Sequence, residues 1–218
     1  ALEIDNLIIE MDNLELPILD GSAAPFVEIL EKAQVIEQEA TKSFFKPKRN
    51  IYFKVEETGS EYFLEPSDDF SLKVQIDYGT DILNNSEAII TDITEFRTEC
   101  ANARTFVFLH ELENLLNQGM IKGGDLENAI VLADKELSKE KLSNLAQLFN
   151  KKEVKIQKNG TLNNLELRYE NEPARHKLLD VIGDLSLIGS PIKGKLVVKK
   201  PGHKANVAFA KKMNEIMK

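Results

Sequence analysis

The chain has 218 residues, of which 42% are hydrophobic and 29% are charged, so it is long enough to bury one large core or two modest ones. Its net charge of -8 argues against a nucleic-acid-binding protein, because a phosphate-binding surface needs clustered lysine and arginine. No apolar run approaches the length that crosses a bilayer, and no secretory signal pattern opens the sequence. The single cysteine, Cys100, excludes an internal disulfide.

The predicted elements alternate between strands and helices in an order that is typical of an α+β protein. Short apolar or alternating runs predict strands at 7–10, 51–55, 61–64, 71–76, 89–93, 129–132 and 195–199. Helical periodicity predicts helices at 23–33, 106–118, 138–150, 173–187 and 207–218, the second of them closed by Gly119. The basic, proline-containing residues 43–50 are predicted to be a linker. We therefore expect a small first unit over residues 1–45 and a fuller second unit over residues 46–218.

The segment 173–187 carries the best candidates for chemistry. His176 and Asp180 are four residues apart, so in a helix they project from the same side and could reach one cation. Zinc accepts this mixture of nitrogen and oxygen ligands. Asp184 lies one turn further along the same face and could orient an imidazole. Lys177, beside the pair, would suit an anionic substrate or a developing oxyanion.

An ordinary amphipathic helix explains the same segment without a metal. Histidine and aspartate often stand four residues apart by chance, and a hydrogen bond on the helix surface is the usual reason. The segment also has an apolar stripe, which consists of Leu178, Leu179, Ile182 and Leu185. From the spacing alone, both interpretations stay open.

The other two histidines lie in different settings. His203 falls in a predicted loop, 201–206, directly after the strand at 195–199, where an acid or base could meet a substrate. Taken alone, it could equally be an exposed loop histidine. His110 falls within the predicted helix 106–118, and we interpret it as structural or peripheral.

Five short motifs occur in an order that resembles one enzyme family. They are DGSAAPF (20–26), ARTFVF (103–108), GGDLENAIV (123–131), RHKLLDVIGDL (175–185) and KPGHKAN (200–206). Together they are similar to the UDP-3-O-acyl-N-acetylglucosamine deacetylases, the zinc enzymes of the LpxC family in lipid A biosynthesis. The resemblance extends over nearly the whole chain. The segment NEPARHKLLDVIGDL resembles the Bacteroidetes-type enzymes, in which a hydroxyacyl-ACP dehydratase is often fused downstream.

The resemblance implies a zinc-dependent deacetylase with two α/β units, each a sheet with a helix layer, and an active site between them. By this resemblance, His176 and Asp180 would be zinc ligands. His203 would be the general acid that protonates the departing amine, and Asp184 would hold its charged imidazole. That pairing is chemically consistent, because an imidazolium beside a carboxylate retains its proton better.

The resemblance also implies contacts with the substrate, UDP-3-O-acyl-N-acetylglucosamine. Thr105 would help to stabilise the oxyanion, and Lys177 and Phe106 would contact the substrate. Gly124 would belong to the adjoining substrate-binding loop. Such an enzyme would work in the cytoplasm near the inner membrane, because its substrate is a nucleotide sugar with an acyl chain.

One expected motif is not found in these residues. The family takes a further zinc ligand and its general base from a Glu-His pair in a TVEH motif, and the 218 residues contain no Glu-His dipeptide. The sequence also starts with Ala1 rather than methionine and ends inside a helical pattern. We therefore expect an N-terminally truncated piece with an incomplete first unit, inactive or nearly so. Two alternatives stay open: a non-catalytic paralogue that binds a UDP-sugar or a partner protein, and a different metal hydrolase with the same ligands.

Overall fold

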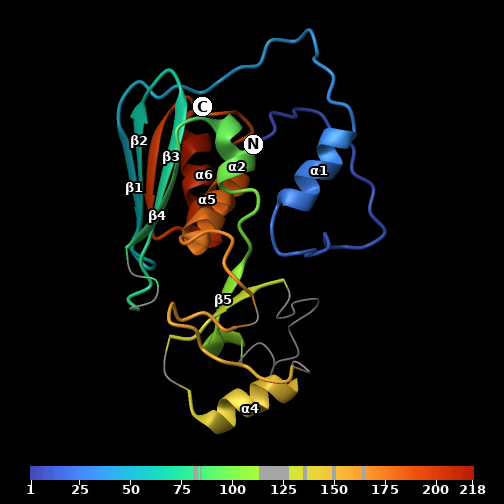
Figure 1. The fold of residues 1–218 in the computed structure, drawn as a ribbon. Coiled ribbons are helices and arrows are strands. Elements are labelled where there is room, and N and C mark those ends of the chain that lie inside the picture. Colours follow the sequence, from blue (N-terminus) through green and yellow to red (C-terminus); the bar gives the residue numbers. More distant parts are fainter. Residues whose placement is uncertain (81–82, 84, 113–127, 135–136, 149–150, 164) are drawn as a thin grey trace.

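The computed structural model describes residues 1–80, 83, 85–112, 128–134, 137–148, 151–163 and 165–218. Its largest element is a five-stranded mixed sheet with the strand order β1-β2-β7-β3-β4 (Figure 1). The strands are β1 (Ile51–Val55), β2 (Ser60–Pro66), β3 (Phe70–Ile76), β4 (Ser86–Ile90) and β7 (Gly194–Lys199). Strand β7 runs antiparallel to β2 and parallel to β3. The last strand in the sequence therefore lies in the middle of the sheet.

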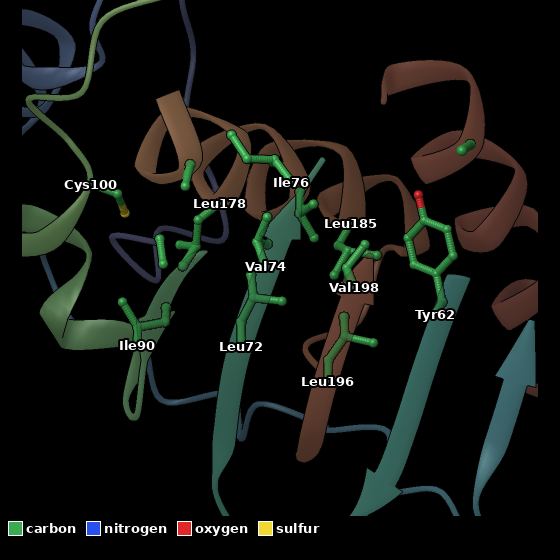
Figure 2. Packing of buried hydrophobic residues seen from close by; sticks show 14 of the residues in the cluster. Tyr62, Leu72, Val74, Ile76, Ile90, Cys100, Leu178, Leu185, Leu196 and Val198 are labelled. Atoms are coloured by element: carbon green, nitrogen blue, oxygen red, sulfur yellow. The ribbon is translucent and has the colours of Figure 1, made fainter. Parts of the chain in front are cut away.

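A layer of two helices packs beside this sheet (Figure 1). They are α5 (Glu172–Leu185), which continues into the short η2 (Ser186–Ile188), and α6 (His203–Ile216). Alternate residues of β3 are buried, as expected for a strand with one face on a core. Figure 2 shows Leu178 and Leu185 of α5 within the same apolar cluster as Val74 of β3 and Val198 of β7. The apolar stripe that the sequence indicated on α5 thus forms part of the main core.

A smaller layer lies beyond the main sheet and has its own hydrophobic core (Figure 1). It contains β5 (Phe106–Phe108), β6 (Ile130–Leu132) and α4 (Lys139–Leu148). Strands β5 and β6 pair in parallel. Residues of this second core include Leu109, Val131, Leu145 and Leu162, all buried. The strand predicted at 129–132 and the helix predicted at 138–150 are confirmed within one or two residues among those described.

The N-terminal stretch is mostly irregular. Its helix is α1 (Ala24–Lys32), which confirms the helix predicted at 23–33, and Val27 of α1 joins the main core. Further along are η1 (Ile93–Glu95) and α2 (Phe96–Glu99). The strand predicted at 7–10 is wrong: within the fully described stretch 1–80 these residues form no strand, and Ile8 is 88% exposed. An apolar run becomes a strand only where a neighbouring strand completes its backbone hydrogen bonds.

Two further predictions differ from the structure. Residues 106–108 were expected to begin a helix, but they form β5, because the aromatic and β-branched sequence Phe-Val-Phe pairs with β6. Residues 109–112 of that expected helix are helical, as predicted, while 113–118 and the cap Gly119 lie outside the described residues. His203 was expected in a loop, but it is the first residue of α6, because Gly202 in extended conformation serves as the N-cap.

The α+β class predicted from the order of elements is confirmed by these two sheets and the helices beside them. The strands predicted at 51–55, 61–64, 71–76 and 195–199 are also confirmed, since alternating patterns mark half-buried strands well. The strand predicted at 89–93 lies earlier, at β4. In the described part of the chain, none of the helices combines the length and the apolar character that a bilayer span needs.

Candidate active site

Helix α5 brings four of the predicted site residues onto one side. Pro173 occupies its first turn, where a missing backbone N–H costs no hydrogen bond, and Glu172 beside it suits the positive end of the helix dipole. Three turns of regular helix then place His176, Asp180 and Asp184 in a row at intervals of four residues. The first two of these side chains are buried. A buried imidazole and a buried carboxylate need polar partners, and their partners define the site.

The ring of His176 is held by a backbone carbonyl. Its Nδ1 lies 3.0 Å from the carbonyl oxygen of Ala103, which can only accept a hydrogen bond, so Nδ1 carries the proton. The other nitrogen, Nε2, then has a free lone pair and lies 3.5 Å from Oδ1 of Asp180. Burial lowers the pKa of His176, while Asp180 and the Ala103 carbonyl act in the opposite direction. The neutral ring is therefore the favoured form, and it is the form that ligates metals.

The second oxygen of Asp180 faces the side chains of Lys177 and His203. Lys177 Nζ donates a hydrogen bond to Oδ2 at 2.8 Å, and His203 Nε2 lies 3.9 Å from the same oxygen. His203 comes from α6, so this carboxylate is the point where the two helices bring their functional groups together. The ring of His203 is fixed from behind by Asp184, whose Oδ2 lies 2.9 Å from Nδ1.

The start of β5 closes the site on another side. The ring of Phe106 meets the ring of His176 edge-on, with centroids 6.4 Å apart, and Lys177 Nζ lies 5.2 Å above the same phenyl ring. Tyr78 lies edge-on to Phe106 as well. Burial raises the pKa of Tyr78 to about 12, with the negative charge of Asp180 next in importance, so its phenol remains protonated.

Thr105 is held in place by a glycine 84 positions earlier in the sequence. Its backbone N–H donates to the carbonyl of Gly21 at 2.8 Å, and its own carbonyl accepts from Ile130 N at 2.9 Å. Gly21 has a φ of +81°, and a Cβ built on it would lie 1.8 Å from the backbone oxygen of Asn128. The motif DGSAAPF thus requires glycine at this point for two separate reasons.

We expect Gly21→Ala to lower the thermal stability of the protein and to displace Thr105. The expected loss is about 2 kcal/mol or more, the sum of left-handed backbone strain and a backbone clash. Gly59→Ala is a matched control, because Gly59 also has a positive φ of +68° but its added Cβ meets nothing within 4 Å. Thermal melts of both variants measure the difference. Equal losses of stability in the two variants would show that the close approach of Gly21 to Asn128 does not contribute to the effect.

The structure therefore brings together most of the predicted site residues. His176, Asp180, His203, Asp184 and Lys177 form one continuous set of polar contacts. The ring of Phe106 contacts His176 of this set, and Thr105 is the residue directly before Phe106 in the chain. Gly124 and its neighbour Gly123 lie outside the described residues.

Sequence reasoning missed two groups that hold this arrangement: the carbonyl of Ala103 and the side chain of Asn206, which donates to Asp184 Oδ2 at 2.7 Å. One feature of the sequence could have pointed to Asn206. It stands three residues after His203, so the two side chains share one helix face if a helix begins at His203, as α6 does.

The geometry of His176 and Asp180 fits zinc. Two ligand atoms on a tetrahedral zinc with bonds of about 2.05 Å are about 3.4 Å apart, close to the observed Nε2–Oδ1 distance. The Ala103 carbonyl also supplies the outer hydrogen bond that fixes the tautomer of metal-binding histidines. Within the described ranges, no group of three or more His, Cys, Asp and Glu side chains could hold a metal ion. His176 and Asp180 are thus two candidate ligands, one fewer than the three protein ligands of a typical catalytic zinc site.

Comparison with known protein families shows the family to which this chain belongs. A family model described as UDP-3-O-acyl N-acetylglycosamine deacetylase (LpxC) matches residues 1–148 and 143–215. The chain belongs to this deacetylase family. The resemblance drawn from the five motifs is thereby confirmed, and the matched residues include all of α5 and all but the last residue of α6.

Curated relatives in the LpxC family match the chain almost from end to end. The bifunctional enzyme LpxC/FabZ of Bacteroides thetaiotaomicron is 45% identical over 215 residues, which cover 99% of this chain and 47% of the relative. The enzyme of the same name from Porphyromonas gingivalis is 39% identical over 218 residues, with 100% and 47% covered. The UDP-3-O-acyl-N-acetylglucosamine deacetylase of Thermodesulfovibrio yellowstonii is 36% identical over 213 residues, with 97% and 64% covered. The chain thus spans about half the length of the bifunctional relatives.

Proposed function

We propose that the chain is part of a zinc-dependent deacetylase that removes the acetyl group from UDP-3-O-acyl-N-acetylglucosamine in lipid A biosynthesis. One observation carries this proposal. His176 on α5 and His203 on α6 both face the carboxylate of Asp180, in a chain that belongs to the deacetylase family. In this proposal residues 1–45 belong to a first deacetylase domain, and residues 46–218 form the second, which holds both helices.

His176 and Asp180 would hold the zinc ion. The neutral ring of His176 offers Nε2, and Asp180 offers Oδ1, while its Oδ2 keeps the contact with Lys177. When bound, zinc supplies a Lewis acid that polarises the amide carbonyl of the acetyl group. Phe106 lies against the ring of His176, and Lys177 binds Asp180, so both would contact the substrate. Thr105 would donate to the oxyanion. Gly124 would belong to the loop beside them.

His203 would act as the general acid. An amine is a poor leaving group unless its nitrogen is protonated as the carbon–nitrogen bond breaks. Asp184 binds Nδ1 of His203, so the proton to be donated sits on Nε2, the nitrogen that faces Asp180. His203 is 68% exposed on its side chain, which leaves room for a substrate amine beside it.

The location and partners of the whole protein follow from the same proposal. A substrate that is a nucleotide sugar with an acyl chain places the reaction in the cytoplasm near the inner membrane. Because relatives of this chain are named LpxC/FabZ, we expect a second part after residue 218, a hydroxyacyl-ACP dehydratase fused to the deacetylase.

The test is zinc content and deacetylation rate of the 218 residues alone, compared with a version extended at the N-terminus to include a Glu-His pair. We expect the extended protein to bind one zinc ion and to deacetylate the UDP-sugar. We expect the 218 residues alone to bind zinc weakly and to lose about 10²-fold or more in rate, because they contain no Glu-His dipeptide to serve as ligand and base. An extended protein that binds zinc and the UDP-sugar but never deacetylates it would favour a non-catalytic paralogue instead.

A further inference from the structure

Asn206 is a fully buried polar side chain that the proposed chemistry does not use. It lies in the first turn of α6, one turn after His203. Its Nδ2 donates to Oδ2 of Asp184 at 2.7 Å, and its Oδ1 accepts a hydrogen bond from the hydroxyl of Tyr62 at 2.5 Å. A buried amide costs free energy unless both its ends find partners, and here both ends do.

The hydroxyl of Tyr62 determines which way the Asn206 amide points. Tyr62 lies on β2 and is fully buried, with its ring stacked on Phe209 at a centroid distance of 4.6 Å. Figure 2 shows its oxygen directed away from the strand, toward the helix layer. The phenol O–H needs an acceptor, and the amide oxygen of Asn206 is the acceptor it has. The amide nitrogen must then face Asp184, and a reversed amide would leave two buried donors opposed.

The same oxygen of Asp184 receives both groups from α6. Oδ2 accepts from Nδ2 of Asn206 and lies 2.9 Å from Nδ1 of His203. Two donors that come from one helix turn and converge on one oxygen prevent the carboxylate from rotating. With Asp184 fixed, the imidazole of His203 is fixed as well, and its Nε2 stays directed at Asp180.

We propose that Asn206 is a positioning residue for the general acid: set in place by Tyr62, it holds Asp184 so that His203 Nε2 faces the reaction centre. This inference rests on the proposed function, since it assumes that His203 donates a proton. It also has an alternative, in which Asn206 only joins α5 to α6 and contributes to stability. The two roles predict different results when His203 is absent.

The test uses the full-length, zinc-loaded deacetylase and four proteins: wild type, Asn206→Ala, His203→Ala and the double variant. We expect Asn206→Ala to lower kcat by about 10- to 100-fold, as for other partners that orient a reacting group. We expect KM and zinc content to stay within about twofold, because Asn206 does not face the substrate. In the His203→Ala background, adding Asn206→Ala should change kcat by no more than about twofold.

Asn214→Ala is the matched control, because it removes another asparagine hydrogen bond from α6, to the carbonyl of Leu187, far along the helix from His203. We expect it to leave kcat unchanged. If circular dichroism shows that Asn206→Ala does not fold, Tyr62→Phe replaces it in the same set of four proteins. Tyr62→Phe removes only the hydroxyl that orients Asn206. We expect it to lower kcat severalfold when His203 is present and to leave kcat unchanged in the His203→Ala background.

Two results would overturn the inference. One is wild-type kcat in a folded Asn206→Ala protein. The other is an equal loss of kcat with and without His203, which is what a stabilising role alone produces. A different result bears on the proposed function itself: if His203→Ala keeps wild-type turnover, His203 is not the general acid. The single variant at His203 thus separates the failure of the function from the failure of the inference.

Discussion

Under the proposed function, replacing His176 by alanine in the full-length protein should abolish zinc binding and most of the deacetylase activity. His176 offers the lone pair of Nε2 next to Asp180, and alanine offers none. Lewis-acid activation contributes several kcal/mol to catalysis, and a loss of about 4 kcal/mol corresponds to a loss of about 10³-fold in kcat/KM. Metal analysis by mass spectrometry and initial rates on the UDP-sugar measure both effects in the same preparation.

His110→Ala is the matched control for zinc content. His110 lies near Asp134, with Nδ1 3.2 Å from Oδ2, and its side chain is 56% exposed. It is the one histidine of the three that is not a candidate site residue. Among the contacts of the described residues, none joins His110 directly to His176 or Asp180. We expect this variant to retain its zinc. Retained zinc in both variants would refute the assignment of His176 as a ligand.

Among the carboxylates outside the site that the structure describes, Glu172 should cost the most folding stability when it is changed to glutamine. Glu172 is fully buried and accepts four hydrogen bonds. Its Oε1 accepts from the backbone N–H and Nε of Arg104, and its Oε2 accepts from Nη2 of Arg104 and the backbone N–H of Arg168. Removing one partner of such a pair leaves a buried guanidinium without compensation, which costs about 3–5 kcal/mol. Urea unfolding followed by circular dichroism measures the change.

A matched control and a compensating variant make this result specific. Glu57→Gln breaks an exposed ion pair with Lys204 on α6, and we expect no resolvable change in stability. The double change Arg104→Met with Glu172→Gln should recover part of the loss, because no buried guanidinium is then left without a counter-charge and the glutamine can still accept a backbone hydrogen bond. Equal effects of the two glutamate variants would mean that the Arg104–Glu172 pair is no more important than a surface pair.

The same ion pair has a consequence for the site. Arg104 stands between Ala103, whose carbonyl fixes the tautomer of His176, and Thr105. By tying residue 104 to the first turn of α5, Glu172 sets the position of both neighbours relative to the candidate zinc ligands. We therefore expect the Glu172 variant that remains folded to show weaker zinc binding as well as lower stability.

How much of this could be predicted from the sequence depended on how local the signal was. The helix with His176 and Asp180 and the strands at 51–55 and 71–76 follow from periodicity within a few residues, and they are confirmed. The strand at 106–108 was missed, because it exists only through pairing with residues 130–132. The strand expected at 7–10 failed for the converse reason, since a strand pattern alone supplies no partner.

Contacts between distant positions were beyond prediction. The carbonyl that fixes the tautomer of His176 lies 73 residues earlier in the chain, and the tyrosine that orients Asn206 lies 144 residues earlier. No pattern in one sequence reports such pairs, because they arise only when separate elements pack together. The candidate ligands were therefore visible in the sequence, while the groups that aim them were not.

The central place of β7 has a consequence for biosynthesis. During synthesis, β2 and β3 emerge from the ribosome more than a hundred residues before the strand that fills the space between them. Their facing edges remain without partners for that interval, which makes the nascent chain prone to premature association. Helix α6, which brings His203 to Asp180, follows β7 directly, so the contact between these two side chains can form only after β7 has been translated.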